Sequence, residues 1–239
     1  MTLLPALDRS LIRDLPLFAR MADAVLDDIL RTASSRRCAA ADTIFEQGGE
    51  ASEFFLLLHG RLRVTQVTPD GQQIVVRMVN PGDLFGIARA LHRDDYPATC
   101  AAAIESIVLA WPMSVWDDLL ARHHELAIGA MRAVGSRLQD AHTRIREMTT
   151  EVVERRVGHT VLRLTKQSGK REAQGIRIDF PISKQDLAEM TGTTLFTVSR
   201  ILSAWEGAGI VVTGRQKLVV TDPHRLLLIA DGVEAGLLS

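Results

Sequence analysis

The pattern of apolar and polar positions changes twice along the chain. Over residues 1–30, apolar side chains recur at intervals of three and four, which is typical of amphipathic helices, and Pro16 is expected to divide this stretch in two. Residues 36–113 instead contain short runs of branched apolar residues separated by glycine-rich turns, which predicts about eight short strands in a sandwich or barrel. The clearest runs are Phe54–Leu58, Leu62–Val67, Ile74–Val79 and Ile104–Trp111.

From residue 112 to residue 152 the period is helical again, and Ser114 is suited to cap the start of the helix. Between Ala127 and Val152, apolar residues alternate at intervals of four and three, which is the period of a coiled coil. A helix that packs only on its own domain more often shows a wider stripe. We therefore predict that two copies of the chain pair along this seam. Its members are Met131, Val134, Leu138, Ala141, Ile145 and Met148.

The last part of the chain predicts a compact segment of helices and strands. Residues 166–175 are polar and are expected to form a surface loop. The expected helices cover residues 152–167, 183–191 and 194–207, and a hairpin follows at Ile210–Val212 and Leu218–Thr221. The predicted domains are a β-rich sensor domain at 1–113, a dimerisation helix at 114–152 and a C-terminal domain at 153–239.

Residues 184–202 carry the strongest local motif, a helix-turn-helix. Two helices that cross closely need a small residue in the first helix, and Ala188 is suitable. The turn needs a residue that tolerates a positive φ angle, which Gly192 does. Val198 and Ile201 supply inward-facing apolar side chains, and Thr194 is positioned to cap the second helix.

Charge favours an anionic partner for the C-terminal third. The whole chain has a formal net charge of −1, but residues 150–239 carry 12 Lys/Arg against 10 Asp/Glu, a difference of +2. Arg215 and Lys217 lie near the tip of the hairpin that follows the helix-turn-helix, as expected of a wing over a phosphate backbone. We therefore predict that double-stranded DNA is the partner of this segment.

Composition argues against several other classes of protein. With 46% hydrophobic and 24% charged residues, the chain is typical of a globular protein. No apolar run is long enough for a membrane span, and charged residues interrupt the N-terminal apolar positions, so no secretory signal is predicted. The two cysteines, Cys38 and Cys100, are too few for a disulfide scaffold or a structural zinc site. A cytoplasmic location is the default expectation.

Three phrases, in the order in which they occur, resemble the signatures of the CRP/FNR superfamily of bacterial transcription regulators. They are DTIFEQGGEASEFFLLLHG (42–60), NPGDLFG (80–86) and SKQDLAEMTGTT (183–194), the last continuing to TVSRIL (197–202). The resemblance implies an α+β fold with a cyclic-nucleotide-binding-like β-roll (a jelly roll), a long dimerisation helix and a winged helix-turn-helix. It also implies an effector-gated homodimer that binds a palindromic operator and works with RNA polymerase.

In this superfamily the second helix of the motif enters the major groove, and three of its reading positions fall on Leu195, Phe196 and Arg200 here. Arg200 keeps a guanidinium suited to guanine, whereas Phe196 replaces the usual Glu, the group that accepts from cytosine. Leu195 and Phe196 offer apolar contact, for example to a thymine methyl group. Alternatively, Phe196 packs against the first helix. The predicted DNA-binding residues are Lys184, Gln185, Thr194, Leu195, Phe196, Thr197, Ser199, Arg200, Arg215 and Lys217.

The resemblance also locates an effector pocket whose nucleotide-binding groups are replaced. Members that bind cyclic AMP need a Glu after the Phe-Gly of the second phrase, where this chain has Ile87, and an Arg-Ser pair, which falls on Pro97-Ala98. A cyclic phosphate would lack its cationic partner, so cyclic AMP is not the expected effector. The predicted pocket residues are Gly86, Ile87, Ala88, Pro97, Ala98, Thr99 and His142.

Two branches of the superfamily use iron. Residues 1–37 contain no cysteine, which excludes the iron–sulfur cluster of one branch, and Cys38 and Cys100 are expected to be core thiols. The phrases YPAT (96–99) and GTTLFTVSR (192–200) look like the NnrR-type regulators, which respond to nitric oxide and nitrite and for which haem is implied. The candidate axial ligands are His59, His92, His142 and His159, with His142 first, although a lone histidine is more often a surface residue.

Two other functions compete with a transcription regulator. A cupin-type enzyme also has a small β-barrel, but it needs two or three histidines and a carboxylate for a metal, and the β-rich part has only His59 and His92. A regulatory nucleotide-binding module of a larger assembly is the other alternative, which the helix-turn-helix disfavours. We predict no catalytic residues and no metal ligands, and the effector, the operator and the direction of regulation stay open.

Overall fold

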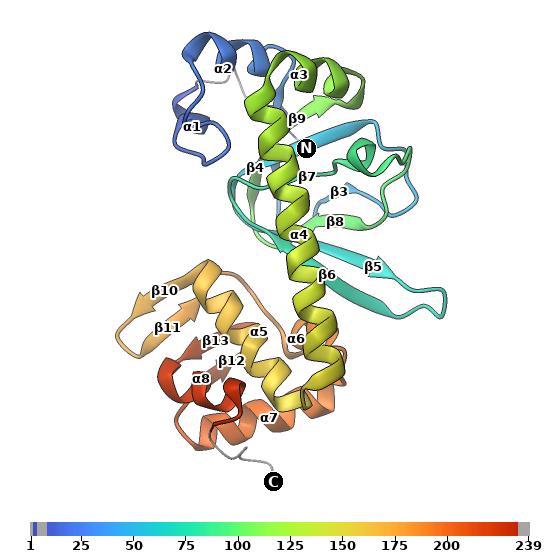
Figure 1. Cartoon of the computed structure of the whole chain (residues 1–239). Coiled ribbons are helices and arrows are strands. Elements are labelled where there is room, and N and C mark those ends of the chain that lie inside the picture. Colours follow the sequence, from blue (N-terminus) through green and yellow to red (C-terminus); the bar gives the residue numbers. More distant parts are fainter. Residues whose placement is uncertain (1, 4–8, 234–239) are drawn as a thin grey trace. The chain divides into compact units, whose positions relative to one another are not determined.

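The computed structural model describes residues 2–3 and 9–233, and these form two compact units (Figure 1). The first unit covers Met1–Gln139 and the second covers Asp140–Ser239. The long helix α4 (His124–Thr150) begins in the first unit and ends in the second.

Two antiparallel sheets form the β-roll of the first unit. The predicted strands are confirmed, and the ends of the four clearest runs differ from the observed strand ends by no more than two residues. One sheet has the order β1-β2-β9-β4-β7, and the other has the order β3-β8-β5-β6. The strands are β1 (Thr2–Leu3), β2 (Ser34–Cys38), β3 (Thr43–Phe45), β4 (Glu53–His59), β5 (Leu62–Val67), β6 (Gln73–Val79), β7 (Leu84–Phe85), β8 (Thr99–Ala102) and β9 (Ser106–Pro112).

Strand β4 divides the first unit into two hydrophobic cores. Successive side chains of a strand point to opposite faces of the sheet, and β4 is apolar on both. Phe54 and Leu56 belong to a core shared with the N-terminal helices, α3 and the start of α4. Phe55 and Leu57 belong to the core inside the β-roll. This burial on both faces explains why the strand reads as a continuous apolar run.

The N-terminal stretch forms two short helices, α1 (Ser10–Arg13) and α2 (Asp23–Leu30), on either side of Pro16, as predicted. Residues 1 and 4–8 of that stretch lie outside the described residues. Ile29 of α2 is fully buried, and its carbonyl accepts a hydrogen bond of 2.8 Å from the indole nitrogen of Trp111 in β9. The bond fixes α2 to the outer face of the sheet.

A single helix from residue 112 to 152 does not form, which corrects the prediction. A 3₁₀ turn at Met113–Val115 leads into α3 (Trp116–Arg122), and His123 separates α3 from α4. Val115, not Ser114, is the residue before α3, and its side chain makes no capping bond. His123 is buried, and its Nε2 lies 2.8 Å from Oδ2 of Asp28 in α2. This distant contact decides where the helical stretch is interrupted.

The second unit is a winged helix. Its sheet has the order β10-β11-β13-β12, and its helices pack on one another through buried side chains that include Val157, Val198, Ile201 and Trp205. The elements are α5 (Val153–Ser168), β10 (Gly169–Glu172), β11 (Gly175–Ile178), α6 (Lys184–Thr191), α7 (Leu195–Gly207), β12 (Val211–Gly214), β13 (Lys217–Val220) and α8 (Pro223–Asp231).

The polar stretch 166–175 is not a loop, which is a second correction. Helix α5 continues to Ser168, and the next residues form the hairpin β10–β11. Strand β11 pairs with β13 of the wing, with Ile176 opposite Val220. The hairpin therefore gains its order from a strand more than 40 residues away, which local polarity does not reveal.

We expect the turn at Gly60 to be the most sensitive glycine position in the β-roll. Gly60 has a φ of +96°, and a Cβ atom there would lie 2.6 Å from the carbonyl oxygen of Glu105. Gly60→Ala is expected to lower the free energy of unfolding by about 2–4 kcal/mol through strain and overpacking. Urea unfolding followed by tryptophan fluorescence measures this.

Gly71→Ala is the matched control, because Gly71 has a φ of +84° and a Cβ atom added there would have no other atom within 4 Å. It is expected to cost about 1–2 kcal/mol from the left-handed backbone alone. Equal losses for the two variants would show that the contact with Glu105 is not limiting.

Candidate nucleic-acid interface and effector site

Helices α6 and α7 form the predicted helix-turn-helix. Ala188 of α6 is 1% exposed. Gly192 ends α6 with φ 61° and ψ 45°, the left-handed conformation expected for the turn. The side chain of Thr194 accepts a hydrogen bond of 3.1 Å from the backbone N–H of Thr197, and so caps α7. The turn chemistry that the sequence predicts is therefore present.

Ser183 caps α6 in a way that the sequence analysis did not identify. Its hydroxyl accepts from the backbone N–H of Asp186 at 3.0 Å, and the Asp186 carboxylate accepts from the backbone N–H of Ser183 at 2.8 Å. The pair forms a capping box. The signal was an Asp three residues after a Ser, at the start of an apolar period.

Helix α7 has one buried face and one solvent-exposed face. Val198, Ile201, Leu202 and Trp205 are no more than 2% exposed. On the other side, Leu195 is 49% exposed and Phe196 is 75% exposed, and Arg200 is also exposed. Phe196 does not pack against the first helix, so that alternative is wrong.

The polar residues beside this face contact one another. The ammonium group of Lys184 donates to the hydroxyl of Ser199 at 3.2 Å, which joins the first turn of α6 to α7. Gln185 donates to Glu189 at 3.0 Å. Hydroxyl and ammonium groups keep further hydrogen-bonding capacity, so these contacts orient the side chains without exhausting them.

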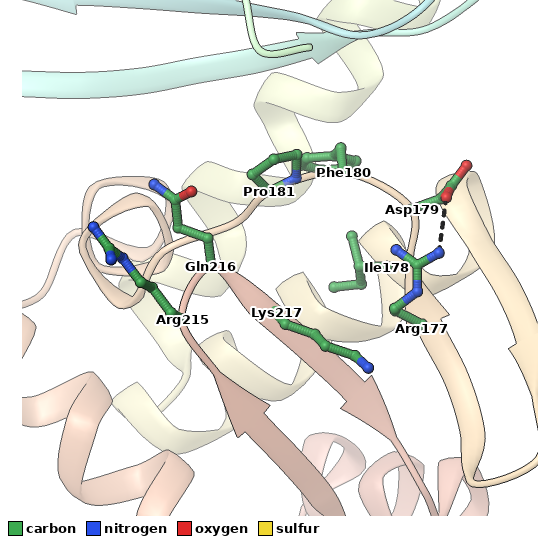
Figure 2. Close-up of a pocket in the computed structure, with 8 residues that line it drawn as sticks. All are labelled: Arg177, Ile178, Asp179, Phe180, Pro181, Arg215, Gln216 and Lys217. Carbon is green, nitrogen blue, oxygen red and sulfur yellow. Dashed lines mark hydrogen bonds and ion pairs between the residues drawn. The ribbon is translucent and has the colours of Figure 1, made fainter.

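The wing tip and the segment from Arg177 to Pro181 line an open pocket of about 280 Å³ (Figure 2). The backbone carbonyl of Gln216, which has a φ of 56°, accepts from the N–H of Ile182 at 3.1 Å and holds the tip in place. Figure 2 shows Lys217 extended toward the Arg177 side of the pocket, with Arg215 on the opposite side.

The two basic wing residues differ in their electrostatic surroundings. The ammonium group of Lys217 lies 3.9 Å from a carboxylate oxygen of Glu172 in β10. Glu172 also pairs with Arg177, whose hydrogen bond is the main cause of a lowered pKa for this carboxyl group. Arg215 makes no ion pair with any residue in the described part of the chain. Sequence reasoning treated the two wing cations alike and missed Arg177.

The predicted seam of α4 is bare along most of its length. Met131, Leu138, Ile145 and Met148 are 67%, 56%, 60% and 55% exposed, and Ala141 is exposed as well. Val134 is half-buried and packs against the core of the first unit. Large apolar side chains exposed in a row at this spacing are typical of the contact surface of a coiled coil.

Two family models match the chain over most of its length. The cyclic nucleotide-binding domain matches residues 35–123, and the Crp-like helix-turn-helix domain matches residues 155–229. The chain belongs to the CRP/FNR family of transcription regulators. The predicted family, its fold and its DNA-binding role are thereby confirmed.

Relatives of this CRP/FNR regulator align along nearly their whole length. The global nitrogen regulator of Synechocystis sp. is 26% identical over 227 residues, covering 92% of this chain and 98% of that protein. The cyclic AMP receptor protein of Thermus thermophilus is 27% identical over 218 residues, covering 91% and 98%. A solved CRP-family transcriptional regulator from Thermus thermophilus has a TM-score of 0.71 and 27% identity, covering 82% and 96%.

Six of the seven predicted effector residues lie in the β-roll, and most of them are packed rather than open. Ile87 and Ala88 are 2% exposed, and Ala98 is 7% exposed. The carbonyl of Pro97 accepts from Gln66 at 2.8 Å, and the hydroxyl of Thr99 accepts from the backbone N–H of Gln47 at 3.0 Å. A Cβ atom added at Gly86 would meet the ring of Phe55 at 2.8 Å. The seventh, His142, is exposed on α4 in the second unit.

The candidate haem ligands do not fit a haem site. A haem iron ligand lies in a pocket whose polarity and access the protein controls. His59, His92 and His142 are exposed, and Nε2 of His159 lies 3.4 Å from a carboxylate oxygen of Glu151. None of the four has the enclosed apolar surroundings that a haem requires.

The cysteines and the hydropathy of the helices bear on two further expectations. Cys38 and Cys100 are free, buried thiols, as predicted, and burial raises the pKa of Cys100 to about 12. Such a thiol is almost entirely protonated at neutral pH and is unreactive. In residues 2–3 and 9–233, no helix has both the length and the apolar character that a bilayer crossing demands.

Proposed function

We propose that this regulator binds a palindromic operator as a homodimer, with α7 in the major groove and an effector acting through the β-roll. The observation that carries this proposal is the bare face of α7. A 13-residue helix that is buried on one side exposes Leu195, Phe196 and Arg200 together on the other. Leu195 and Phe196 are adjoining exposed apolar side chains, and contiguous apolar surface of this kind is typical of a contact site.

Base reading falls to the three residues of this face. The guanidinium of Arg200 donates two parallel hydrogen bonds to guanine, and Leu195 and Phe196 contact thymine methyl groups. No carboxylate stands at position 196 to accept from the N4 amino group of cytosine. We infer that the half-site differs from the one read by members that have a Glu at this position.

Phosphate contacts surround the reading face. Lys184 and Gln185 lie in the first turn of α6, and Thr194, Thr197 and Ser199 lie in the first turns of α7. Their hydroxyl, amide and ammonium groups suit phosphate oxygens. On the wing, Arg215 is the stronger phosphate-binding candidate, because the Glu172 carboxylate already lies near Lys217.

Dimerisation is assigned to α4 and to the seam from Met131 to Met148. A parallel pair about a two-fold axis would present the two α7 helices to successive major grooves, about 34 Å apart. We propose residues 114–152 as the dimerisation segment and RNA polymerase as a further partner of the DNA-bound dimer.

The effector is inferred not to be cyclic AMP, although one relative is named for that nucleotide. Ala98 stands at the second position of the phosphate-binding pair and is packed into the core. A buried phosphate without a cation at that point is unfavourable. The candidate histidines do not fit haem, so nitric oxide bound through haem is not the proposed effector.

The reading face is tested by selecting bound sequences from a random DNA pool. Arg200→Ala is expected to weaken operator binding by about 1–3 kcal/mol and to relax the preference at one base pair. Phe196→Glu is expected to shift the preference toward a cytosine at the facing position. An unchanged site preference for Arg200→Ala would contradict the assignment of α7 as the reading helix.

Because the Glu172 carboxylate lies beside Lys217, we expect its removal to raise the affinity for DNA. Glu172→Gln removes the carboxylate beside Lys217 and Arg177, so all DNA sequences are expected to bind more tightly at low salt. The plot of log affinity against log salt should steepen by up to about one unit. Asp231→Asn makes the same charge change on α8 and serves as the control. Equal effects of the two variants would show that the wing does not face phosphate.

The seam is tested with Leu138→Asp, which places a charge in the proposed dimer contact. We expect monomers by light scattering and an operator affinity lower by about 100-fold or more, because two linked reading heads are lost. Gln139→Asp adds the same charge at the next exposed position and should leave the dimer intact. A dimer that survives Leu138→Asp would exclude this seam.

A further inference from the structure

One arginine in the second unit joins the ends of two helices that have different proposed roles. The backbone carbonyl of Glu151, directly after α4, accepts a hydrogen bond of 2.9 Å from Nη1 of Arg156 in α5. The carbonyl of Thr191, the last residue of α6, accepts one of 3.2 Å from Nε of the same guanidinium. Arg156 therefore links the end of the proposed dimerisation helix to the first helix of the helix-turn-helix.

Both carbonyls are groups that a cation stabilises. The last carbonyls of a helix have no partner within the helix, and the negative end of the helix dipole lies there. Thr191 is 2% exposed, so its carbonyl has little access to water, and a buried acceptor without a donor costs free energy. A guanidinium holds its donors in a rigid, planar arrangement. Two bonds from this one group therefore restrict the angle between the two helix ends.

An apolar contact joins the same two elements. A Cβ atom added at Gly192, the turn residue that follows α6, would lie 2.8 Å from the methyl carbon of Met148 in α4. Met148 is also a member of the proposed dimer seam. The end of α4 therefore lies against the turn of the helix-turn-helix itself, in addition to its link through Arg156.

We propose that Arg156 is a positioning residue that fixes the helix-turn-helix on α4 and thereby sets the half-site spacing that the dimer accepts. In two chains related by a two-fold axis, the separation of the α7 helices follows from the orientation of each helix-turn-helix on its own α4. Arg156 acts in this way without contacting DNA. The inference rests on the proposed dimeric reading of a palindromic operator, and it adds the residue that determines the spacing.

The preceding residue supplies a matched control. Arg155 donates from Nε to the carbonyl of Ala230 at 2.9 Å and from Nη2 to that of Asp231 at 3.3 Å, at the C-terminal end of α8. It is the same residue type on the same helix and also binds two carbonyls, but these belong to α8 rather than to the ends of α4 and α6. Arg155→Met and Arg156→Met therefore remove the same charge, and only the second should loosen the helix-turn-helix.

The attachment is measured within one chain by pulsed electron paramagnetic resonance on the full-length protein. Nitroxide labels are placed by Arg146→Cys in α4 and Ser203→Cys in α7, at two solvent-exposed positions. The two native cysteines are buried and are not expected to react. Dilution with excess unlabelled chain limits the signal to pairs within one chain. We expect Arg156→Met to widen the distribution of label distances by about twofold or more, and Arg155→Met to leave it unchanged. An unchanged width in Arg156→Met overturns the proposal.

DNA binding is measured on three duplexes built from the site that the native protein selects: the palindrome, a single half-site, and the palindrome with one base pair inserted at its centre. Arg156→Met should weaken binding to the palindrome by about tenfold or more, because loosely attached reading heads lose effective concentration, and half-site affinity should change by less than about twofold. Its preference for the native spacing over the inserted one should fall by a similar factor. Equal losses on the palindrome and the half-site would show a general structural defect and overturn the proposal.

Arg156→Lys keeps the test decisive if Arg156→Met does not fold. Lysine keeps the charge but lacks the rigid pair of donors, so we expect an intermediate widening of the distances and an intermediate loss of spacing preference. Native values for both in Arg156→Lys overturn the proposal. A selection that yields no palindrome would count against the proposed dimeric reading only, because the label distances within one chain still decide whether Arg156 fixes the helix-turn-helix.

Discussion

The buried face of α7 is the constraint on which the DNA-binding role depends. Trp205 and Ile201 are sealed into the second unit, and the indole nitrogen of Trp205 donates to the carboxylate of Glu154 in α5 at 2.9 Å. Because these contacts fix the rotation of α7 about its axis, they also determine which residues lie on its exposed face. Leu195, Phe196 and Arg200 are exposed to solvent because Val198, Ile201, Leu202 and Trp205 occupy the buried face of the same helix.

This regulator has a small net charge, and many of its basic side chains are paired with acidic ones. The chain as a whole is almost neutral, and several of its basic side chains are already paired with acidic neighbours, as Arg177 is with Glu172 and Asp179. Exposed cations without such partners at the DNA-facing side are therefore few, and Arg200 and Arg215 are the clearest among the described residues. Such an arrangement limits non-specific attraction to DNA and leaves more of the affinity to base contacts.

The β-roll has the architecture of a cyclic nucleotide-binding domain, but the residues that the resemblance aligns with the nucleotide-binding groups, Ile87, Pro97 and Ala98, are apolar. Ala98, which the resemblance aligns with the second residue of the usual phosphate-binding pair, is 7% exposed and packs inside the β-roll. Arg137 of α4, which is partly buried, donates to the backbone carbonyl of Leu84 beside the β6–β7 turn, and Arg77 of β6 lies 4.0 Å from a carboxylate oxygen of Asp83.

Features that depend on local chemistry can be predicted from the sequence. The strand periods, the small residue Ala188, the left-handed Gly192 and the cap Thr194 were all readable, because each is restricted by its immediate neighbours. Tertiary structure alone decided the break at His123, which depends on Asp28, and the order of β10–β11, which depends on β13. The tertiary structure also determines which basic side chains pair with carboxylates, as Arg177 does with Glu172. These outcomes depend on residues far apart in the chain, and no local pattern encodes the distance between them.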